Sequence, residues 1–130
     1  MQNEEQFTVK TELITMFEDC GGLLSAIGDE NRQRIIVSLI RNPGQRVEDI
    51  RKCTDLSRPA VSHHLKVLKD ASVVTIVKKG TMNFYFPNCE SEIWNRLFDL
   101  ASMIRDTAKN LTENGSLEDR RRVLIDELDD

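Results

Sequence analysis

The sequence predicts a mainly α-helical (α+β) protein in which two short helices, joined by a tight turn, precede a two-stranded β-hairpin, with long helices at both ends. Three observations predict this class. Apolar residues recur every three or four positions over most of the chain, which is the helical period. Between residues 73 and 86 the pattern becomes β-branched and alternating, as in strands. A long apolar helical stripe lies on each side of this central region.

Composition points to a globular protein. The chain has 130 residues, of which 39% are hydrophobic and 31% are charged. We expect one domain over residues 1–114, followed by a charged helix or flexible tail over residues 115–130. No stretch approaches the ~20 apolar residues of a membrane span, and the acidic first ten residues lack the apolar core of a signal peptide. We therefore expect a cytoplasmic protein without a membrane partner.

The net charge of −4 conceals an uneven distribution. Residues 1–31 carry a net charge of −6, and residues 87–130 carry a net charge of −5. Residues 32–86 contain eleven basic and four acidic side chains, which gives a net charge of +7. A localised basic region is what a phosphate-binding surface requires, although an ordinary solvated face can have the same composition.

Two helices are predicted before the basic turn region. The first covers residues 8–28, where Gly21-Gly22 is a candidate break because glycine is a poor helix former. The second covers residues 30–41, and Asp29 can cap its N-terminus. The expected buried stripe of this second helix consists of Ile35, Ile36, Leu39 and Ile40.

A helix-turn-helix is predicted next. Its first helix has Val47, Ile50 and either Cys53 or Thr54 at helical spacing. Its second helix follows the sequence "DLS", with Ser57 as the expected cap and a proline in the first turn, where a missing N–H group costs nothing. The expected inward residues of the second helix are Val61, Leu65 and Leu68.

A β-hairpin and a long helix complete the predicted fold. The strands are "VVTIV" at 73–77 and "MNFYF" at 82–86, in which Met82, Phe84 and Phe86 alternate with Asn83 and Tyr85. Gly80 lies at the turn, so the hairpin makes the helix-turn-helix a winged one with a basic tip. The long helix covers residues 89–111 and ends at Asn114-Gly115. Its expected apolar stripe is Ile93, Leu97, Leu100, Ala101, Ile104 and Leu111, widened by Trp94 and Phe98.

The polar face of the second helix is the candidate functional site. If its valine and leucines point inward, the opposite face is short, polar and positive, and it fits the major groove of double-stranded DNA. The residues expected on or beside that face are Arg58, Pro59, Ser62, His63, Lys66 and Lys69. Ser57 can place a backbone N–H group or its hydroxyl on a phosphate. In the wing, Lys78, Lys79 and Thr81 are expected to reach neighbouring phosphates or the minor groove.

These residues resemble a known family. The segments "LSAIGDENRQRIIVSLI", "VEDI" and "LSRPAVSHHLKVLKDASVV", followed by the hairpin, look like the ArsR family of winged-helix repressors. The resemblance runs from about residue 23 to residue 86, which is half of the chain. It implies a transcriptional repressor that binds a pseudo-palindromic operator as a homodimer through its first and last helices. The expected interface residues are Leu13, Phe17, Ile93, Leu97, Ala101 and Ile104.

The metal-binding residues of that family are not matched. Metal-sensing members carry two cysteines in the first helix of the motif, where this chain has Arg46 and Glu48. A second metal site of the family uses Asp/His and His/Glu pairs on the last helix, and residues 89–111 contain no histidine. We therefore expect neither a metal site nor a cofactor. The turn has Asp55 where the family often has glycine, and aspartate tolerates the left-handed conformation better than most residues.

The histidines and cysteines also have interpretations other than DNA contact. His63 and His64 are adjacent on a helix and so point about 100° apart, which suits a DNA-facing His63 and a partly packed His64 better than a metal pair. The three cysteines lie far apart without a C-x-x-C pair, and Cys53 is expected to be a core residue. Cys20 with Cys89 could form a thiol-based redox sensor, but buried structural thiols are the commoner case.

Two classes of function remain for this chain, a DNA-binding repressor and a protein–protein interaction module. Trp94 and Phe98 could line a small-molecule site at the dimer interface, and the sequence does not identify an effector. The main alternative to a DNA-binding repressor is a winged-helix module for protein–protein contact. An enzyme is not expected, because the chain has no phosphate-binding glycine loop, nucleophile elbow or recognisable pair of catalytic carboxylates.

Overall fold

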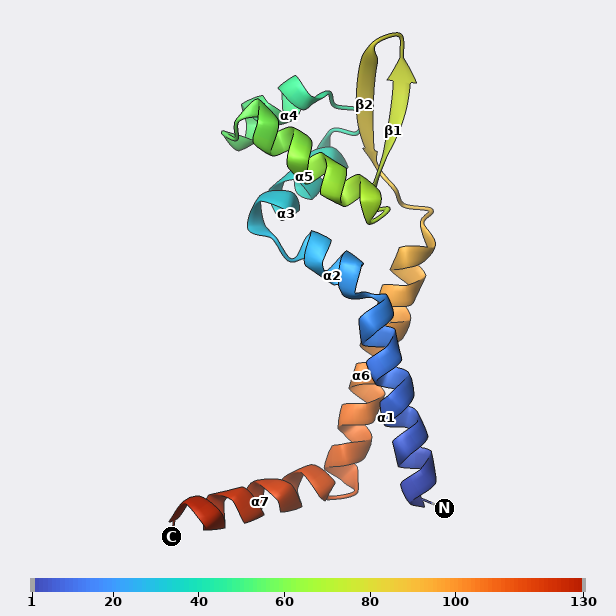
Figure 1. Ribbon diagram of the computed structural model, residues 1–130, viewed down its shortest axis with the longest axis vertical. Helices are drawn as coiled ribbons and strands as arrows, with labels where there is room; N and C mark the ends of the chain where they lie inside the picture. The colour runs from blue at the N-terminus through green and yellow to red at the C-terminus, as the bar shows by residue number, and fades with distance from the viewer. Residues whose placement is uncertain (1, 130) are drawn as a thin grey trace. The chain divides into compact units, whose positions relative to one another are not determined.

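The computed structural model describes residues 2–129 and confirms the mainly helical class with a two-stranded hairpin (Figure 1). The elements of this range are α1 (Gln2–Asp19), α2 (Gly21–Ile27), α3 (Glu30–Arg41), α4 (Val47–Thr54), α5 (Arg58–Asp70), β1 (Val74–Lys79), β2 (Met82–Pro87), α6 (Glu92–Glu113) and α7 (Ser116–Asp129). They form two compact units. The central unit covers residues 19–96, and the terminal unit comprises residues 1–18 and 97–130.

The core of the central unit is built from one stripe of each helix α3, α4 and α5. Six of its side chains are 0% exposed: Ile35, Leu39, Ile50, Val61, Leu65 and Leu68. The predicted inward face of α5 is thus confirmed. The stripe predicted for α3 was too wide, because Ile40 is 63% exposed. Ile40 lies about 100° around the helix from Leu39, and that turn carries its side chain out of the core.

Local signals predicted from sequence set the helix boundaries. The carboxylate of Asp29 accepts a hydrogen bond from the backbone N–H of Arg32 at 3.0 Å and caps α3. The hydroxyl of Ser57 accepts one from the backbone N–H of Ala60 at 3.3 Å and caps α5. Asp55, between α4 and α5, has φ +58°, so the expected left-handed residue is present in the helix-turn-helix turn.

The hairpin pairs β1 with β2 in antiparallel register from Val74 opposite Pro87 to Lys79 opposite Met82. Gly80 has φ +63° at its tip, which any residue with a β-carbon adopts less readily. Tyr85 is the buried residue of β2, whereas Met82 is 44% exposed. The backbone of Tyr85 also pairs with Gln45, which forms an isolated bridge on the free edge of β2.

Two helices begin away from their predicted positions, and the C-terminal segment, expected to be a helix or a flexible tail, is helical. The first helix begins well before residue 8, and it breaks at Cys20, directly before the glycine pair. The last long helix begins at Glu92, so Cys89 lies ahead of it rather than in its first turn. Residues Ser116–Asp129 form a helix, and the backbone N–H of Ser116 donates to the Asn114 side chain.

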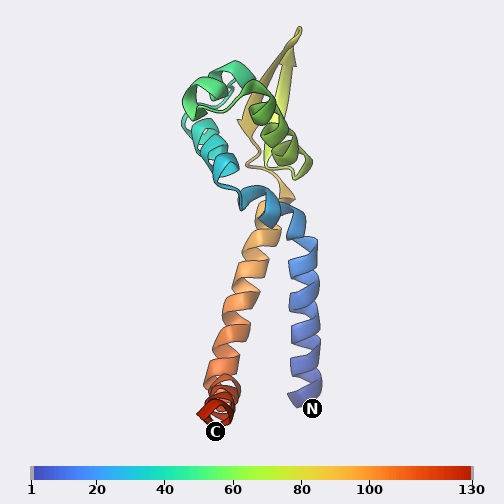
Figure 2. The same ribbon diagram turned by 60° about the vertical axis from the view of Figure 1, so that its left-hand side comes forward.

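Within the terminal unit, α1 and α6 lie side by side in both ribbon views (Figure 2). An open groove of about 650 Å³ lies between them and is lined by residues of both helices, among them Val9 and Leu111. None of the helices formed by residues 2–129 combines the length and apolarity that a membrane crossing requires.

Candidate nucleic-acid interface

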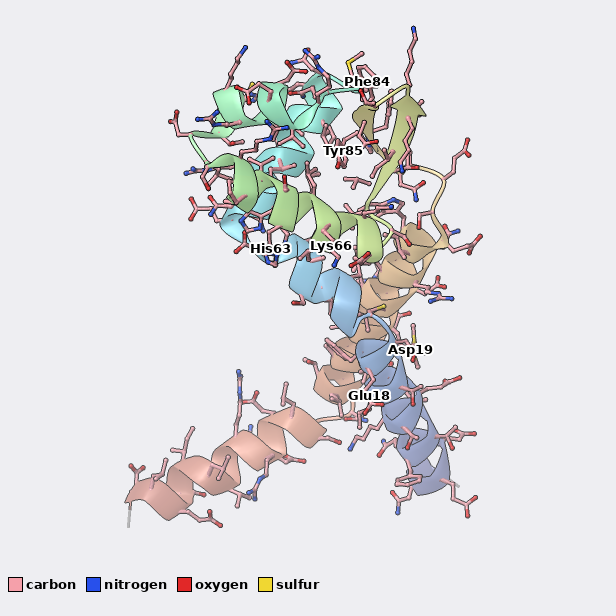
Figure 3. All side chains as sticks on the ribbon, turned by 45° about the horizontal axis from the view of Figure 1, so that its top comes forward. Glu18, Asp19, His63, Lys66, Phe84 and Tyr85 are labelled. Atoms are coloured by element: carbon pink, nitrogen blue, oxygen red, sulfur yellow. The ribbon has the colours of Figure 1, made fainter. Side chains whose placement is uncertain are left out.

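Helix α5 divides into a buried face and an exposed face. All six residues expected on its outward side are exposed: Arg58, Pro59, Ser62, His63, Lys66 and Lys69. Figure 3 shows His63 and Lys66 along the same edge of α5, as their spacing of three residues requires. The buried valine and leucines on the other side hold the helix in place. The result is a short cationic surface with hydroxyl and imidazole groups interspersed, without a carboxylate before the end of the helix.

The wing supplies a second exposed basic group of residues. Lys78, Lys79 and Thr81 are all exposed around the turn at Gly80. The base of the wing is held by Asn88, whose side-chain amide donates to the carbonyl of Ser72 at 3.1 Å. Because the base is fixed and the tip is free of packing, the lysines can reach a phosphate backbone without disturbing the core.

One arginine connects three helices beneath the exposed face of α5. The guanidinium of Arg32 on α3 donates to the carbonyls of Ser25 at 3.1 Å and Ala26 at 2.7 Å, at the C-terminal end of α2. Its third contact is Nδ1 of His64 on α5 at 3.2 Å. The last carbonyls of a helix have no partner within it, so Arg32 supplies donors that α2 lacks. His64 is half-buried, as expected, and contacts Arg32 rather than facing outward.

The capping carboxylate beside this network is held in its charged form. The pKa of Asp29 is lowered, chiefly because its carboxylate accepts the backbone hydrogen bond from Arg32. The charges of Arg32 and His64 lower the pKa of Asp29 further, against the effect of desolvation. A carboxyl group with a lowered pKa stabilises the fold above its unfolded-state pKa. This contribution is lost as the pH falls through the folded-state pKa, so the cap weakens only under acidic conditions.

Sequence reasoning missed several supporting residues. Arg32 was counted only as a charge, because nothing in the local pattern reveals a contact with position 64, which is 32 residues away. Gln45 is buried, and its side-chain amide donates to the carbonyls of Ser38 and Asn42, each at 2.8 Å. Gly44 has φ +85°, and a β-carbon there would lie 2.9 Å from the ring of Phe86. A glycine after proline was the only available signal for this close approach.

An effector would either react with the cysteines or bind in an apolar cavity, so the exposure of the thiols and the position of such a cavity are relevant. Cys20 is buried, whereas Cys53 and Cys89 are exposed free thiols. The expectation of a buried Cys53 was wrong, because Thr54 takes the core position and its hydroxyl donates to the carbonyl of Ile50 at 2.8 Å. Trp94 lines a small apolar cavity of about 120 Å³ in the central unit, together with Cys89. In the described part of the chain, no three His, Cys, Asp or Glu side chains gather as metal ligands do.

The residues expected at a dimer interface are only partly covered in the single chain. Phe17, Ala101 and Ile104 are exposed, and Leu13, Ile93 and Leu97 are half-buried. Further large apolar side chains on the same helices are also exposed, including Phe7 at 73% and Phe98 at 71%. An apolar surface of this extent on two neighbouring helices is typical of a protein–protein interface.

Comparisons with known proteins agree with this architecture. The family model described as bacterial regulatory protein, arsR family, matches residues 29–75, which run from α3 into β1. An uncharacterised HTH-type transcriptional regulator of Methanocaldococcus jannaschii is 36% identical over 70 residues, which are 54% of this chain and 79% of that protein. The arsenical resistance operon repressor of Bacillus subtilis is 31% identical over 81 residues, which are 62% of this chain and 74% of the repressor.

A solved structure supports the same fold. The crystal structure of an ArsR-family transcriptional regulator matches with a TM-score of 0.61 and 21% identity, covering 71% of this chain and 92% of the other. At this identity the match bears on the fold alone. The region that the family model matches, residues 29–75, contains α5 and its exposed face.

Proposed function

The chain belongs to the arsR family of bacterial regulatory proteins, and from this premise we propose that it represses transcription by binding a pseudo-palindromic operator as a homodimer. Helix α5 enters the major groove, and the wing contacts the adjacent backbone. The protein is not an enzyme, needs no metal or cofactor, and acts in the same compartment as the DNA. One observation carries the proposal: an exposed cationic face on α5 lies directly over a stripe of side chains that are 0% exposed.

The chemistry of that face fits the roles proposed for it. Arg58 can donate two parallel hydrogen bonds to the O6 and N7 atoms of a guanine, and Ser62 and His63 can reach other base-edge acceptors. Lys66 and Lys69 carry single flexible charges suited to phosphate. The buried stripe fixes the direction of these side chains, so base contacts form without reordering the helix.

A direct test measures binding to genomic fragments of the source organism across a salt series. We expect enrichment of specific fragments, and an affinity that falls steeply with salt as bound phosphates release their counterions. A chain that captures no DNA even at low salt would instead have a solvated basic face and act in protein–protein contact. Repeating the capture with metals, oxidants and chelators identifies any effector.

Substitution of the wing lysines is expected to weaken binding to all DNA sequences alike. In Lys78→Ala and Lys79→Ala, the loss of each phosphate contact should lower the slope of log affinity against log salt by about 1. The measurement is a salt titration with the operator fragment and with unrelated DNA. If only operator binding weakened, the wing would contact bases instead of phosphates.

The homodimer is proposed on the apolar surface of α1 and α6. These helices flank an open groove and leave large side chains such as Phe7 and Phe98 in water. A second copy that buries this surface would remove it from solvent and present two α5 helices to the two halves of a palindromic site.

Charged substitution at this surface is expected to give monomers. Leu97→Asp or Ile104→Asp places a carboxylate where the second copy would pack, and burial of an unpaired charge is strongly unfavourable. Sedimentation analysis should then show monomers or an unstable fold. Lys109→Asp is the control, because Lys109 lies about 140° around α6 from Ile104 and is exposed. Folded dimers of the Leu97 and Ile104 variants would refute the proposed interface.

A further inference from the structure

Helix α7 has an apolar stripe that none of the other described residues covers. Every residue of the helix is exposed, including Leu117, Leu124 and Ile125, and Leu128 is 84% exposed. Leu117, Leu124 and Leu128 lie within about 40° of one another around the helix axis, and Ile125 borders them. The opposite side carries Asp119, Arg122, Asp126 and Asp129. An amphipathic helix of this kind is stable when its apolar side is buried against a partner.

We propose that α7 pairs in antiparallel orientation with α7 of a second copy of the chain. The spacing fits a heptad seam in which Leu117 and Leu124 occupy d positions and Arg121 and Leu128 occupy a positions. In an antiparallel pair the a positions face the d positions of the other helix. Leu117 then meets Leu128 of the second copy, and Arg121 meets Leu124. The aliphatic stem of Arg121 can pack on that leucine, while its guanidinium stays near Glu118, 4.0 Å away in the same helix.

The charges beside the seam complement one another in this orientation only. Arg120 and Glu127 occupy successive g positions, and g positions face each other in an antiparallel pair. Arg120 of each copy therefore meets Glu127 of the other, which gives two ion pairs across the seam. A parallel pair would place Arg120 opposite Ile125 and would bring the two Arg121 side chains together, which is unfavourable. Charge complementarity thus selects both the occupant and its direction.

Contacts within α7 do not account for the charges of Arg120 and Glu127. Neither Arg120 nor Glu127 takes part in an ion pair among residues 2–129. Arg120 has no acidic residue three or four positions away, unlike Arg121 and Arg122. The seam is only two heptads long, so it strengthens an association that other contacts begin.

The test is a charge swap in the full-length chain, read by sedimentation equilibrium. Arg120→Glu places like charges opposite each other twice, and we expect self-association to weaken at least about tenfold at low salt. Glu127→Arg should have the same effect. The double variant Arg120→Glu/Glu127→Arg restores opposite charges across the seam, and it should recover the parent association constant. The association constant of each variant is compared with that of the parent. The test therefore applies whether α7 pairs within the proposed dimer or between two dimers.

Arg122→Glu is the matched control. It makes the same charge change on the outward side of α7. There it also removes the favourable charge pairs of Arg122 with Asp119, three residues before it, and with Asp126, four residues after it. It should leave self-association unchanged, and circular dichroism should show equal helix content in all variants. Parent-like association of Arg120→Glu, failure of the double variant to recover, or an equal loss in Arg122→Glu would each overturn the proposal. Because Leu97→Asp separately tests the α1 and α6 surface, failure here leaves the proposed homodimer intact.

Discussion

Arg32→Ala is expected to lower the free energy of unfolding by about 2–4 kcal/mol, because it removes three side-chain hydrogen bonds of a half-buried charged group. The carbonyls of Ser25 and Ala26 lose their donor at the end of α2. His64 on α5 loses the contact that links it to α3. Urea unfolding followed by circular dichroism measures the change. Protein concentration must be held constant, because the proposed dimer would itself add to apparent stability.

Arg34→Ala is the control for this experiment. Arg34 lies on the same helix and carries the same charge, but its side chain is 58% exposed, and its one ion pair among residues 2–129 is with Glu30 in the preceding turn of α3. Such exposed pairs contribute about 0–1 kcal/mol, so this variant should unfold almost like the parent. Equal stability of Arg32→Ala and Arg34→Ala would show that the network beneath α5 does not hold the helices together.

The helix-turn-helix was predictable from sequence because its determinants are local. Val61, Leu65 and Leu68 recur at the helical period, Ser57 precedes a proline in the first turn, and Asp55 suits the left-handed turn. Each signal is read within a few residues of the position it determines. The exposure of the polar face of α5 followed from them, since a helix that buries one side presents the other.

The remaining features depend on contacts between distant residues. Alternation in "MNFYF" defines two faces of the strand but does not say which is buried, and the partner that helps to decide it, Gln45, is 40 residues away from Tyr85. Cys53 and Thr54 fit the helical period about equally. Thr54 is the buried one because its hydroxyl bonds within the helix and leaves the methyl group to pack. Ser72 has φ +64° after the end of α5, and a serine in the sequence does not predict a left-handed backbone conformation.

Arg58→Ala is expected to reduce operator affinity by about 1–3 kcal/mol, that is, roughly fivefold to 150-fold, and to relax the preference for one base. Arg58 is exposed in the first turn of α5, where a helix lying in the major groove brings its side chains closest to the bases. His63→Ala should have a similar effect at a different base, because His63 is also exposed on α5 and lies about 140° around the helix axis from Arg58. Gel-shift titrations with single-base operator variants measure both quantities.

Arg34→Ala also serves here, because it removes one positive charge from the central unit without touching α5. Its expected effect on operator affinity is small and disappears at higher salt, as for a charge that acts only at long range. The effects of Arg58→Ala and His63→Ala should persist at higher salt, since a hydrogen bond to a base releases no counterion. If all three variants lost the same affinity and the loss vanished with salt, α5 would contribute only charge. Sequence discrimination would then reside elsewhere in the protein.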